Sequence, residues 1–292
     1  MRILFVSSNR VGDAVLSTGL LDYLIRSHSE ARVTIACGPA AEGVFARMPN
    51  REQTFLLRKQ PCDLHWLPFW ARMVTRVWDL VVDIRGSALA YLLPARGRAV
   101  LRRRGGHKLV ELASILRLSE PPQPVIWTAP QDRERARCLL SSRQPIIALG
   151  PTANWHPKTW PAEHFAALFK ALSADPLQGA LPAVFGGPGA KERTLADPLL
   201  TLLPQAIDLV GRVSLPEAAA CLARAALYVG NDSGLMHLAA AAGVPTLGLF
   251  GPTAAEQYSP VGRRTAFVRA TTRRMEDLSV EQALAAARHL LI

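Results

Sequence analysis

The stretch 226–253, ALYVGNDSGLMHLAAAAGVPTLGLFGPT, constrains the fold more than any other part of the chain. Its apolar run 227–229 leads into the turn 230–234, which is rich in residues that cap helices. The alanine-rich segment 235–242 is typical of a helix packed closely on a sheet, and Gly243 ends it. A second apolar run, 244–250, is typical of a strand in a buried parallel sheet. The stretch therefore predicts a strand, a helix and a second strand in immediate succession.

The turn before this helix predicts a phosphate site, because backbone N–H groups and the positive end of the helix dipole meet there. Asp232, Ser233 and His237 lie in or next to the turn and suggest chemistry on a phosphorylated ligand. An ordinary helix cap with a histidine facing the core explains the same residues. The segment alone leaves both interpretations open.

Short apolar runs and amphipathic segments alternate through the rest of the chain in two successive blocks. This pattern predicts an α/β fold with two doubly wound, Rossmann-like domains, residues 1–143 and 144–292. Each parallel sheet would bind ligands at the carboxyl ends of its strands, so we expect a cleft shared by the two domains. The final helix, from about 279 to 291, belongs to the second domain, and packing back on the first domain is an alternative for it.

Three segments of the first domain carry weaker patterns. Residues 48–77 fit no regular element, and their scattered aromatic side chains either line a groove or pack in the core. Residues 85–93 are predicted to be helical. The segment 96–108 is predicted to be a basic loop, with the cluster Arg96, Arg98, Arg102, Arg103, Arg104 and Lys108.

Positive charge is concentrated in the first domain. The net charge is +11, and residues 1–143 hold 22 Lys and Arg against 12 Asp and Glu, whereas residues 144–292 hold 12 against 11. The asymmetry predicts an acidic partner, which could be an anionic lipid headgroup or a phosphorylated glycan. No recognised nucleic-acid module is present, so nucleic acid is not an expected partner. A solvated basic loop remains the alternative.

Cysteine spacing and hydropathy limit the class of protein further. The four cysteines are widely spaced without a CxxC motif, which favours free thiols in a reducing compartment. The N-terminal apolar run is too short for a signal peptide and is interpreted as the first strand. No apolar run reaches 18 residues, so we expect no membrane span.

Asp13 is the candidate catalytic residue. It lies at a helix start directly after the first strand, where the helix dipole favours its ionised form, and such a carboxylate can accept a proton from an incoming hydroxyl. From this residue alone, a simple N-cap role is the preferred interpretation of Asp13. Neither a GxGxxG motif nor a Walker A loop is present, which argues against a simple dehydrogenase or a P-loop enzyme.

Two positions in the second domain favour nucleotide binding. Lys158, between a buried strand and a helix start, could neutralise a diphosphate. Glu192 follows the GGPG turn at 186–189, where a carboxylate could hold ribose hydroxyls. Trp155 and Trp160 could stack a base or pack. No DxD motif or clustered ligand set is present, so no metal is expected.

Three signatures together resemble the ADP-heptose–lipopolysaccharide heptosyltransferases of glycosyltransferase family 9. They are Gly12-Asp13-Ala14-Val15-Leu16-Ser17-Thr18, Lys158-Thr159-Trp160-Pro161 and Asp232-Ser233-Gly234-Leu235-Met236-His237. Their order and spacing match over almost the whole chain. The last signature, with its GVPTLGLFGPT continuation, is the most specific.

The resemblance implies a GT-B fold and an inverting, metal-independent transfer of heptose from ADP-heptose, with no cofactor, to a lipid A–Kdo acceptor of the lipopolysaccharide inner core. It implies a cytoplasmic enzyme with peripheral contact at the inner face of the inner membrane. Asp13 would be the general base. The first domain would bind the anionic acceptor, for which we assign Arg10, Gly12, Arg85 and Arg103. The second would bind the donor, for which we assign Thr152, Lys158, Glu192, Val213, Asp232, Ser233, Gly234 and His237.

Two departures from the family concern the acceptor side. The first signature usually continues Thr-Pro, but Gly19 follows Thr18 here, and the 48–77 region is compressed. Transfer of another sugar, or transfer to a different glycan or a protein, is one alternative function, because fold does not fix substrate. The other alternative is a non-catalytic protein that binds nucleotide sugars or anionic lipids. Asp13 argues against it, because a protein that only binds these ligands needs no general base.

Overall fold

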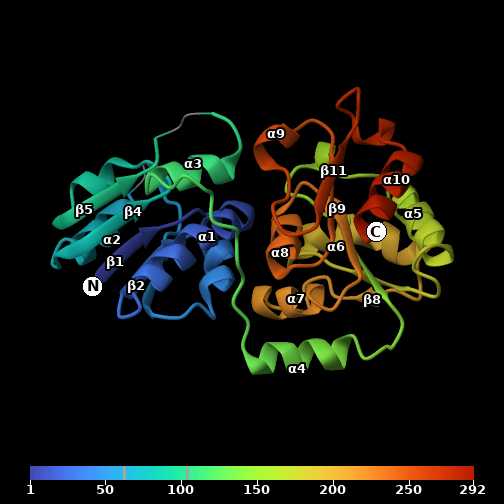
Figure 1. Cartoon of the computed structure of the whole chain (residues 1–292), viewed down its shortest axis with the longest axis horizontal. Helices are drawn as coiled ribbons and strands as arrows, with labels where there is room; N and C mark the ends of the chain where they lie inside the picture. Colours follow the sequence, from blue (N-terminus) through green and yellow to red (C-terminus); the bar gives the residue numbers. More distant parts are fainter. Residues whose placement is uncertain (62–63, 103–104) are drawn as a thin grey trace. The chain divides into compact units, whose positions relative to one another are not determined.

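The computed structural model describes residues 1–61, 64–102 and 105–292 of the chain. The described chain divides into two compact units, Met1–Trp127 and Thr128–Ile292 (Figure 1). The division lies before helix α4 (Pro130–Leu139), whereas the predicted boundary at residue 143 lies after it. The reason is packing, because α4 contacts helix α7 (Leu215–Leu222) of the second unit.

The first unit is built on a parallel sheet with the strand order β3-β2-β1-β4-β5. Its described strands are β1 (Arg2–Val6), β2 (Arg32–Cys37), β3 (Arg51–Leu56), β4 (Trp78–Asp83) and β5 (Ala95–Val100). The central strand β1 is buried from Ile3 to Val6, as its continuous apolar run predicts. This order is the doubly wound arrangement that the alternating pattern predicts.

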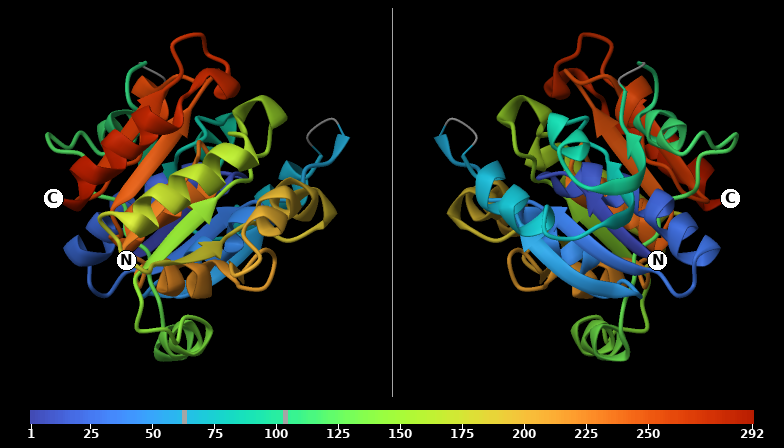
Figure 2. Two further views of the ribbon diagram at one scale, coloured as in Figure 1. Left: turned by 90° about the vertical axis from the view of Figure 1, so that its right-hand side faces the viewer. Right: turned by 90° about the vertical axis from the view of Figure 1, so that its left-hand side faces the viewer.

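Helices of the first unit cover both faces of this sheet, because right-handed crossovers on the two sides of β1 run over opposite faces (Figure 2). One face carries α2, whose Phe69 and Met73 pack with Leu4 and Val6 of β1. The helices are α1 (Val11–Ser27), α2 (Trp66–Met73) and α3 (Lys108–Ile115), with the 3₁₀ turns η1 (Pro39–Phe45) and η3 (Ala88–Tyr91).

The three weakly patterned segments fold differently from their predictions. Residues 48–77 contain both β3 and α2. Residues 85–93 form a loop and the short turn η3 instead of a helix. Much of the predicted basic loop is the edge strand β5, where Arg96 and Arg98 alternate outward. Charged side chains are a common feature of edge strands, and here they hide the strand pattern.

The second unit has a parallel sheet with the order β11-β10-β9-β6-β7-β8. Its strands among the described residues are β6 (Ile146–Gly150), β7 (Leu181–Val184), β8 (Ile207–Asp208), β9 (Leu227–Asn231), β10 (Thr246–Phe250) and β11 (Thr265–Arg269). Strand β6 is central, with β9 on one side and β7 on the other. The stretch 226–253 forms β9, a helix and β10, as predicted.

Two groups of helices cover this second sheet. Helices α4, α7 and α8 contact one another in sequence on one side, and α5 contacts both α6 and α10. The final helix α10 buries Ala283, Ala287 and Leu290 in the core of the second unit. The remaining bounds are α5 (Ala162–Ala174), α6 (Ala190–Leu202), α8 (Gly234–Ala242), α9 (Ala255–Tyr258) and α10 (Val280–Leu291), with the 3₁₀ turns η4 (His156–Lys158) and η5 (Met275–Asp277).

Among the described residues, every helix is too short or too polar to cross a membrane. Cys37 and Cys221 are buried free thiols and Cys138 is an exposed one, while Cys62 lies outside the described residues.

Candidate active site

The strand orders indicate where each unit binds its ligand. In a doubly wound sheet, ligands bind at the carboxyl ends of the strands where the winding reverses direction. This point lies between β1 and β4 in the first unit and between β6 and β9 in the second. Asp13, Lys158 and the 230–234 turn lie in or beside the loops at these two points, while Glu192 and Val213 follow the strands β7 and β8.

Asp13 of the first unit lies in the first turn of α1, immediately after the β1 loop. Its carboxylate accepts a hydrogen bond from the Ser8 hydroxyl, with 3.3 Å between Oγ and Oδ2, and the side chain is only partly buried. The Ser8 hydroxyl in turn accepts from the backbone N–H of Arg10, the N-cap residue of α1. Asp13 therefore does not cap its own helix, and its carboxylate keeps acceptor capacity toward solvent.

Arg85 joins the loop after β4 to the loop after β1. Its guanidinium donates to Asn9 Oδ1 across 3.3 Å and lies 4.8 Å from the centroid of the Trp66 ring, a cation–π contact. Its backbone N–H donates to Asp83, a fully buried carboxylate at the end of β4. The structure thus places Arg85 at the same edge of the sheet as Asp13. Its contacts with Asn9, Trp66 and Asp83 were not predicted from the sequence.

The other acceptor assignments have different outcomes. Gly12 lies beside Asp13 in the first turn of α1, and the side chain of Arg10 is exposed next to it. Arg103 lies outside the described residues.

Gly38, after β2, packs so closely that a Cβ atom there would lie 2.7 Å from the Cα of Asn9, which keeps the β1 loop tight.

Gly19 has a packing role. It is buried in α1, and a Cβ atom there would lie 2.3 Å from the carbonyl oxygen of Pro122 and 2.5 Å from that of Gln123. The neighbouring Thr18 hydroxyl accepts from the N–H of Val125 across 3.0 Å. The glycine lets the chain segment 122–125 lie against α1, so its direct effect is on this packing contact.

In the second unit, Lys158 and Asp232 form an ion pair between the turn after β6 and the turn after β9. The distance from Lys158 Nζ to Asp232 Oδ2 is 2.6 Å, and the side chains are only 19% and 9% exposed. An ammonium group has three N–H donors, so the pair leaves Lys158 able to bind further oxygens. Asp232, as an anion, is better suited to hold Lys158 in place than to contact a phosphate.

Helix α8 begins directly after this pair. Ser233 is its N-cap residue and makes no capping hydrogen bond with its side chain, so the first N–H groups of the helix, from Gly234 onward, are left to solvent or an anion. His237 is buried one turn further along. Burial raises the pKa of the nearby Tyr228.

Asn231 is a positioning residue that sequence reasoning missed. It is fully buried, its Oδ1 accepts from the N–H of Trp160 across 3.1 Å, and its Nδ2 donates to the carbonyl of Pro151 across 2.7 Å. Both ends of the turn that carries Lys158 are therefore fixed to β9. The signal available in the sequence was an asparagine directly before Asp232, which also fits an ordinary turn.

The two tryptophans of this turn differ. Trp160 is a core residue whose indole N–H donates to the carbonyl of Leu278 across 2.9 Å, so its interpretation as packing is confirmed. Trp155 is half exposed.

Glu192, Thr152 and Val213 lie in or beside loops at the same edge of the second sheet. Glu192 is in the first turn of α6, and one carboxylate oxygen accepts from the N–H of Gly187 across 3.0 Å. Thr152 is buried near Gly186, where an added Cβ would lie 3.4 Å from its Cγ2 atom. The partly buried Val213 follows β8, in the loop whose Gly211 N–H binds the carbonyl of Gly186.

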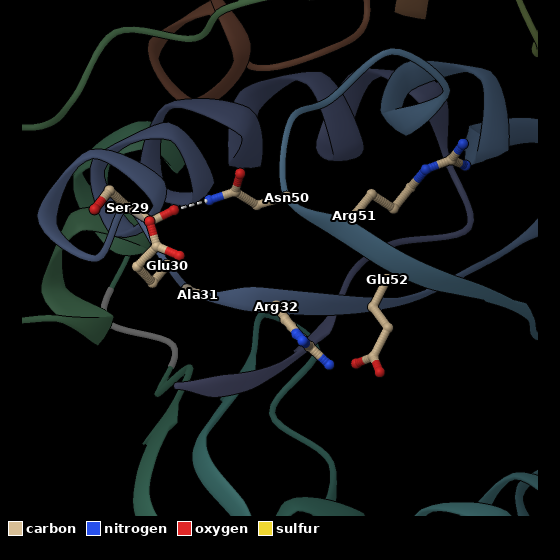
Figure 3. A pocket seen from close by; sticks show the side chains of 7 residues that line it. All are labelled: Ser29, Glu30, Ala31, Arg32, Asn50, Arg51 and Glu52. Carbon is tan, nitrogen blue, oxygen red and sulfur yellow. Dashed lines mark hydrogen bonds between the residues drawn. The ribbon is translucent and has the colours of Figure 1, made fainter.

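A separate hollow of about 380 Å³ lies at the opposite edge of the first sheet (Figure 3). The amino ends of β2 and β3 form it, and Asn50 donates to the carbonyl of Ser29 across it. Its lining includes two arginines and two glutamates, Arg32, Arg51, Glu30 and Glu52. Because ligands of doubly wound sheets bind at the carboxyl edge, we do not count this hollow as part of the site.

A family comparison agrees with this geometry. The model of glycosyltransferase family 9 (heptosyltransferase) matches residues 97–287. The chain belongs to glycosyltransferase family 9. It is therefore a glycosyltransferase, and the three signatures that suggested this family lie at the carboxyl edges of the two sheets.

Named members of family 9 match over nearly the whole chain. Lipooligosaccharide heptosyltransferase 2 of Haemophilus influenzae is 26% identical over 92% of this chain and 88% of its own length. Lipopolysaccharide heptosyltransferase 2 of Salmonella typhimurium is 27% identical over 93% and 89%.

Solved structures confirm the GT-B fold of family 9. A family 9 glycosyltransferase from Veillonella parvula superposes with a TM-score of 0.83, at 21% identity, over 99% of this chain and 97% of that one. The ADP-heptose heptosyltransferase II of Escherichia coli gives 0.79, at 21% identity, over 100% and 98%.

Proposed function

We propose that this enzyme transfers a heptose from ADP-heptose to the inner core of lipopolysaccharide, with inversion at the anomeric carbon and without a metal ion. Two heptosyltransferases that match over most of their lengths support the sugar and the acceptor class. The Lys158–Asp232 pair at the amino end of α8 is the observation that carries the donor side. It sets a cation and helical N–H groups at one point, which suits a diphosphate.

The donor would be held by the second unit. Lys158 and the N–H groups that begin at Gly234 bind the diphosphate, and Asp232 holds Lys158 in place. Ser233 and His237 border this anion site. Glu192 accepts from the ribose hydroxyls with its second carboxylate oxygen, and Thr152 and Val213 border the nucleoside.

The acceptor would be held by the first unit. Asp13 accepts the proton of the acceptor hydroxyl, whose oxygen forms a bond to the anomeric carbon of the heptose. The bond from that carbon to the diphosphate oxygen breaks, and its electron pair leaves with ADP. A single displacement of this kind inverts the anomeric centre. Lys158 and the α8 N–H groups stabilise the charge that develops on the leaving diphosphate.

Arginines near Asp13 suit an anionic acceptor. Arg85 is held by Asn9 and Trp66, and Arg10 lies exposed at the start of α1. Gly12 and Arg103 complete the acceptor assignment. A lipid A–Kdo acceptor is multiply anionic, which agrees with the positive charge of the first unit. The same acceptor would make this a cytoplasmic enzyme with peripheral contact at the inner membrane.

The test is turnover with defined substrates. The purified enzyme is mixed with ADP-heptose and Kdo-containing lipid A acceptors, with and without a first heptose, in the presence of a chelator. We expect ADP release, a product heavier by one heptose and, by NMR of the product, an inverted anomeric configuration. Binding of ADP-heptose without ADP release on any of these acceptors would contradict the proposal. Turnover of another nucleotide sugar alone would select the alternative donor, and loss of activity on chelation would contradict metal independence.

A further inference from the structure

The outer side of α2 exposes large apolar side chains. Leu64, Leu67 and Trp70 are 51%, 60% and 37% exposed, and Tyr91 and Leu92 nearby are 58% and 63% exposed. We call these five residues the α2 surface. Single exposed apolar residues are ordinary, but a contiguous group on one face marks an interaction site.

Contacts within the first unit join the five residues into one patch. Leu64 begins the turn that leads into α2, since its carbonyl accepts from the N–H of Leu67 across 3.1 Å. The indole N–H of Trp70 donates to the carbonyl of Leu92 across 3.1 Å. The inner side of α2 is anchored by buried Phe69 and Met73, so the outward side chains are displayed by a helix fixed to the sheet.

The surroundings of the α2 surface are basic. The described stretch 64–102 holds six arginines and two aspartates. One of these aspartates, Asp83, is buried, and the other, Asp79, is paired with Arg96. Arg72 is exposed on α2 itself. Arg98 donates to the carbonyls of Ala90, Leu93 and Ala95, which places its charge beside Tyr91 and Leu92.

The α2 surface is continuous with the acceptor side of the site. Trp66, the first residue of α2, stacks under the guanidinium of Arg85, which binds the Asn9 side chain in the loop before Asp13. Both α2 and η3 begin at the carboxyl edge of the first sheet, where Asp13 lies.

We propose that the α2 surface docks on an anionic membrane surface. Its leucines and aromatic rings would enter the region between headgroups and acyl chains, where Trp and Tyr are favoured, and the arginines around them would contact anionic headgroups. A second copy of this chain fits less well, because two such basic faces repel each other. The proposal adds a membrane-binding surface to the proposed function and rests on it for the identity of the lipid acceptor.

The test measures vesicle binding without donor or acceptor. The protein is sedimented with vesicles of phosphatidylcholine, with or without phosphatidylglycerol, and compared with the double variant Leu67→Glu/Leu92→Glu. A matched control is Leu202→Glu, since Leu202 is an exposed leucine, at 42%, in the second unit. The native protein and the control should bind the anionic vesicles, and the double variant should lose at least tenfold in affinity. Arg72→Ala should lose about fivefold, and added salt should weaken native binding.

Activity assays separate this proposal from the proposed function. With a water-soluble, deacylated acceptor, the double variant should turn over at the native rate, which also shows that it is folded. With an acceptor embedded in vesicles, its rate should fall at least tenfold. Equal vesicle binding by the double variant and the native protein would overturn the docking proposal, as would a native dimer that the double variant converts to a monomer. Vesicle binding without any heptosyl transfer would overturn the proposed function and leave the docking surface standing.

Discussion

The two units use the same winding of a parallel sheet and fix their site loops by different means. In the second unit, the turn after β6 is fixed to the end of β9 and the turn that follows it by three polar contacts. They run from Trp160 and Pro151 to Asn231 and from Lys158 to Asp232. In the first unit, the loop after β1 is joined to the loop after β4 by the longer contact of Arg85 with Asn9. The difference shows that one fold can supply both a closely fixed polar turn beside a helix start and a more open basic edge.

This contrast agrees with the proposed roles of the two units, in which the second binds the donor and the first binds the acceptor. A diphosphate has fixed geometry and high charge density, so its site gains from preset dipoles and a held cation. A large anionic glycolipid is bound over a wider area, for which exposed arginines and apolar side chains are suited.

Asp13→Asn should lower kcat by roughly 10²–10⁴-fold, because an amide cannot accept the proton of the acceptor hydroxyl. The donor KM should change little, since the proposed donor contacts lie in the second unit. Steady-state ADP release measures both constants. Asp22→Asn, on the same helix and paired with Arg26, is the matched control and should keep native activity. Full turnover by Asp13→Asn would remove this residue from the mechanism.

Lys158→Ala should weaken ADP binding by about 10–100-fold, which corresponds to the loss of a charged hydrogen bond. It should also lower the free energy of unfolding, because Asp232 would be left nearly buried without its cation. Calorimetric titration with ADP and a denaturant melt measure the two effects. Combining Lys158→Ala with Asp232→Asn should recover stability but not affinity, whereas the exposed control Lys170→Ala should change neither. Recovery of affinity in the double variant would show that Lys158 does not bind the diphosphate.

Gly19→Ala should lower the free energy of unfolding by about 1–3 kcal/mol, because its methyl group would overlap the backbone carbonyls of Pro122 and Gln123. This cost should exceed the gain in helix propensity of up to about 1 kcal/mol. Gly97→Ala is the control in the same unit, since a Cβ atom there meets its nearest neighbours at 3.4 Å. Urea unfolding compares the two variants. A Gly19→Ala protein as stable as the native one would mean that segment 122–125 is not held against α1.

Stability should fall in alkali through two buried thiols, Cys37 in the first unit and Cys221 in the second. Burial raises the pKa of Cys37 to about 12 and that of Cys221 to about 11, from an ordinary value of 9.0. Above pH 9 the unfolded chain therefore loses these protons before the folded chain does, and stability present below pH 9 is lost as the pH rises toward the folded values. We expect about 1 kcal/mol per thiol between pH 9 and 10.

The measurement is the free energy of unfolding against pH for three alanine variants. Cys37→Ala and Cys221→Ala should each flatten the alkaline decline, with the larger final difference for Cys37. Cys138→Ala, at an exposed position, should follow the native curve. An unchanged slope in both buried variants would show that these thiols ionise as readily in the folded protein as in the unfolded one.

Local sequence patterns predict much of the fold. The continuous apolar runs of buried parallel strands, as in β1, β2 and β9, predict these strands without tertiary information. Edge strand β5 was missed because its arginines face solvent. Helix α2 was missed because it buries only Phe69 and Met73 while other apolar residues remain outside.

Local sequence patterns predict the α/β class, the order of the two units, the family and the positions of Asp13, Lys158 and the 230–234 turn. The contacts of these side chains follow from the three-dimensional packing alone. Lys158 pairs with Asp232, and Asn231 links β9 to the turn after β6. Gly19 is a position where the backbone of segment 122–125 packs against α1. The physical reason is that strand and helix patterns depend on neighbours a few residues away. These contacts join atoms of residues that are more than seventy positions apart in the chain. A local sequence pattern cannot predict such contacts.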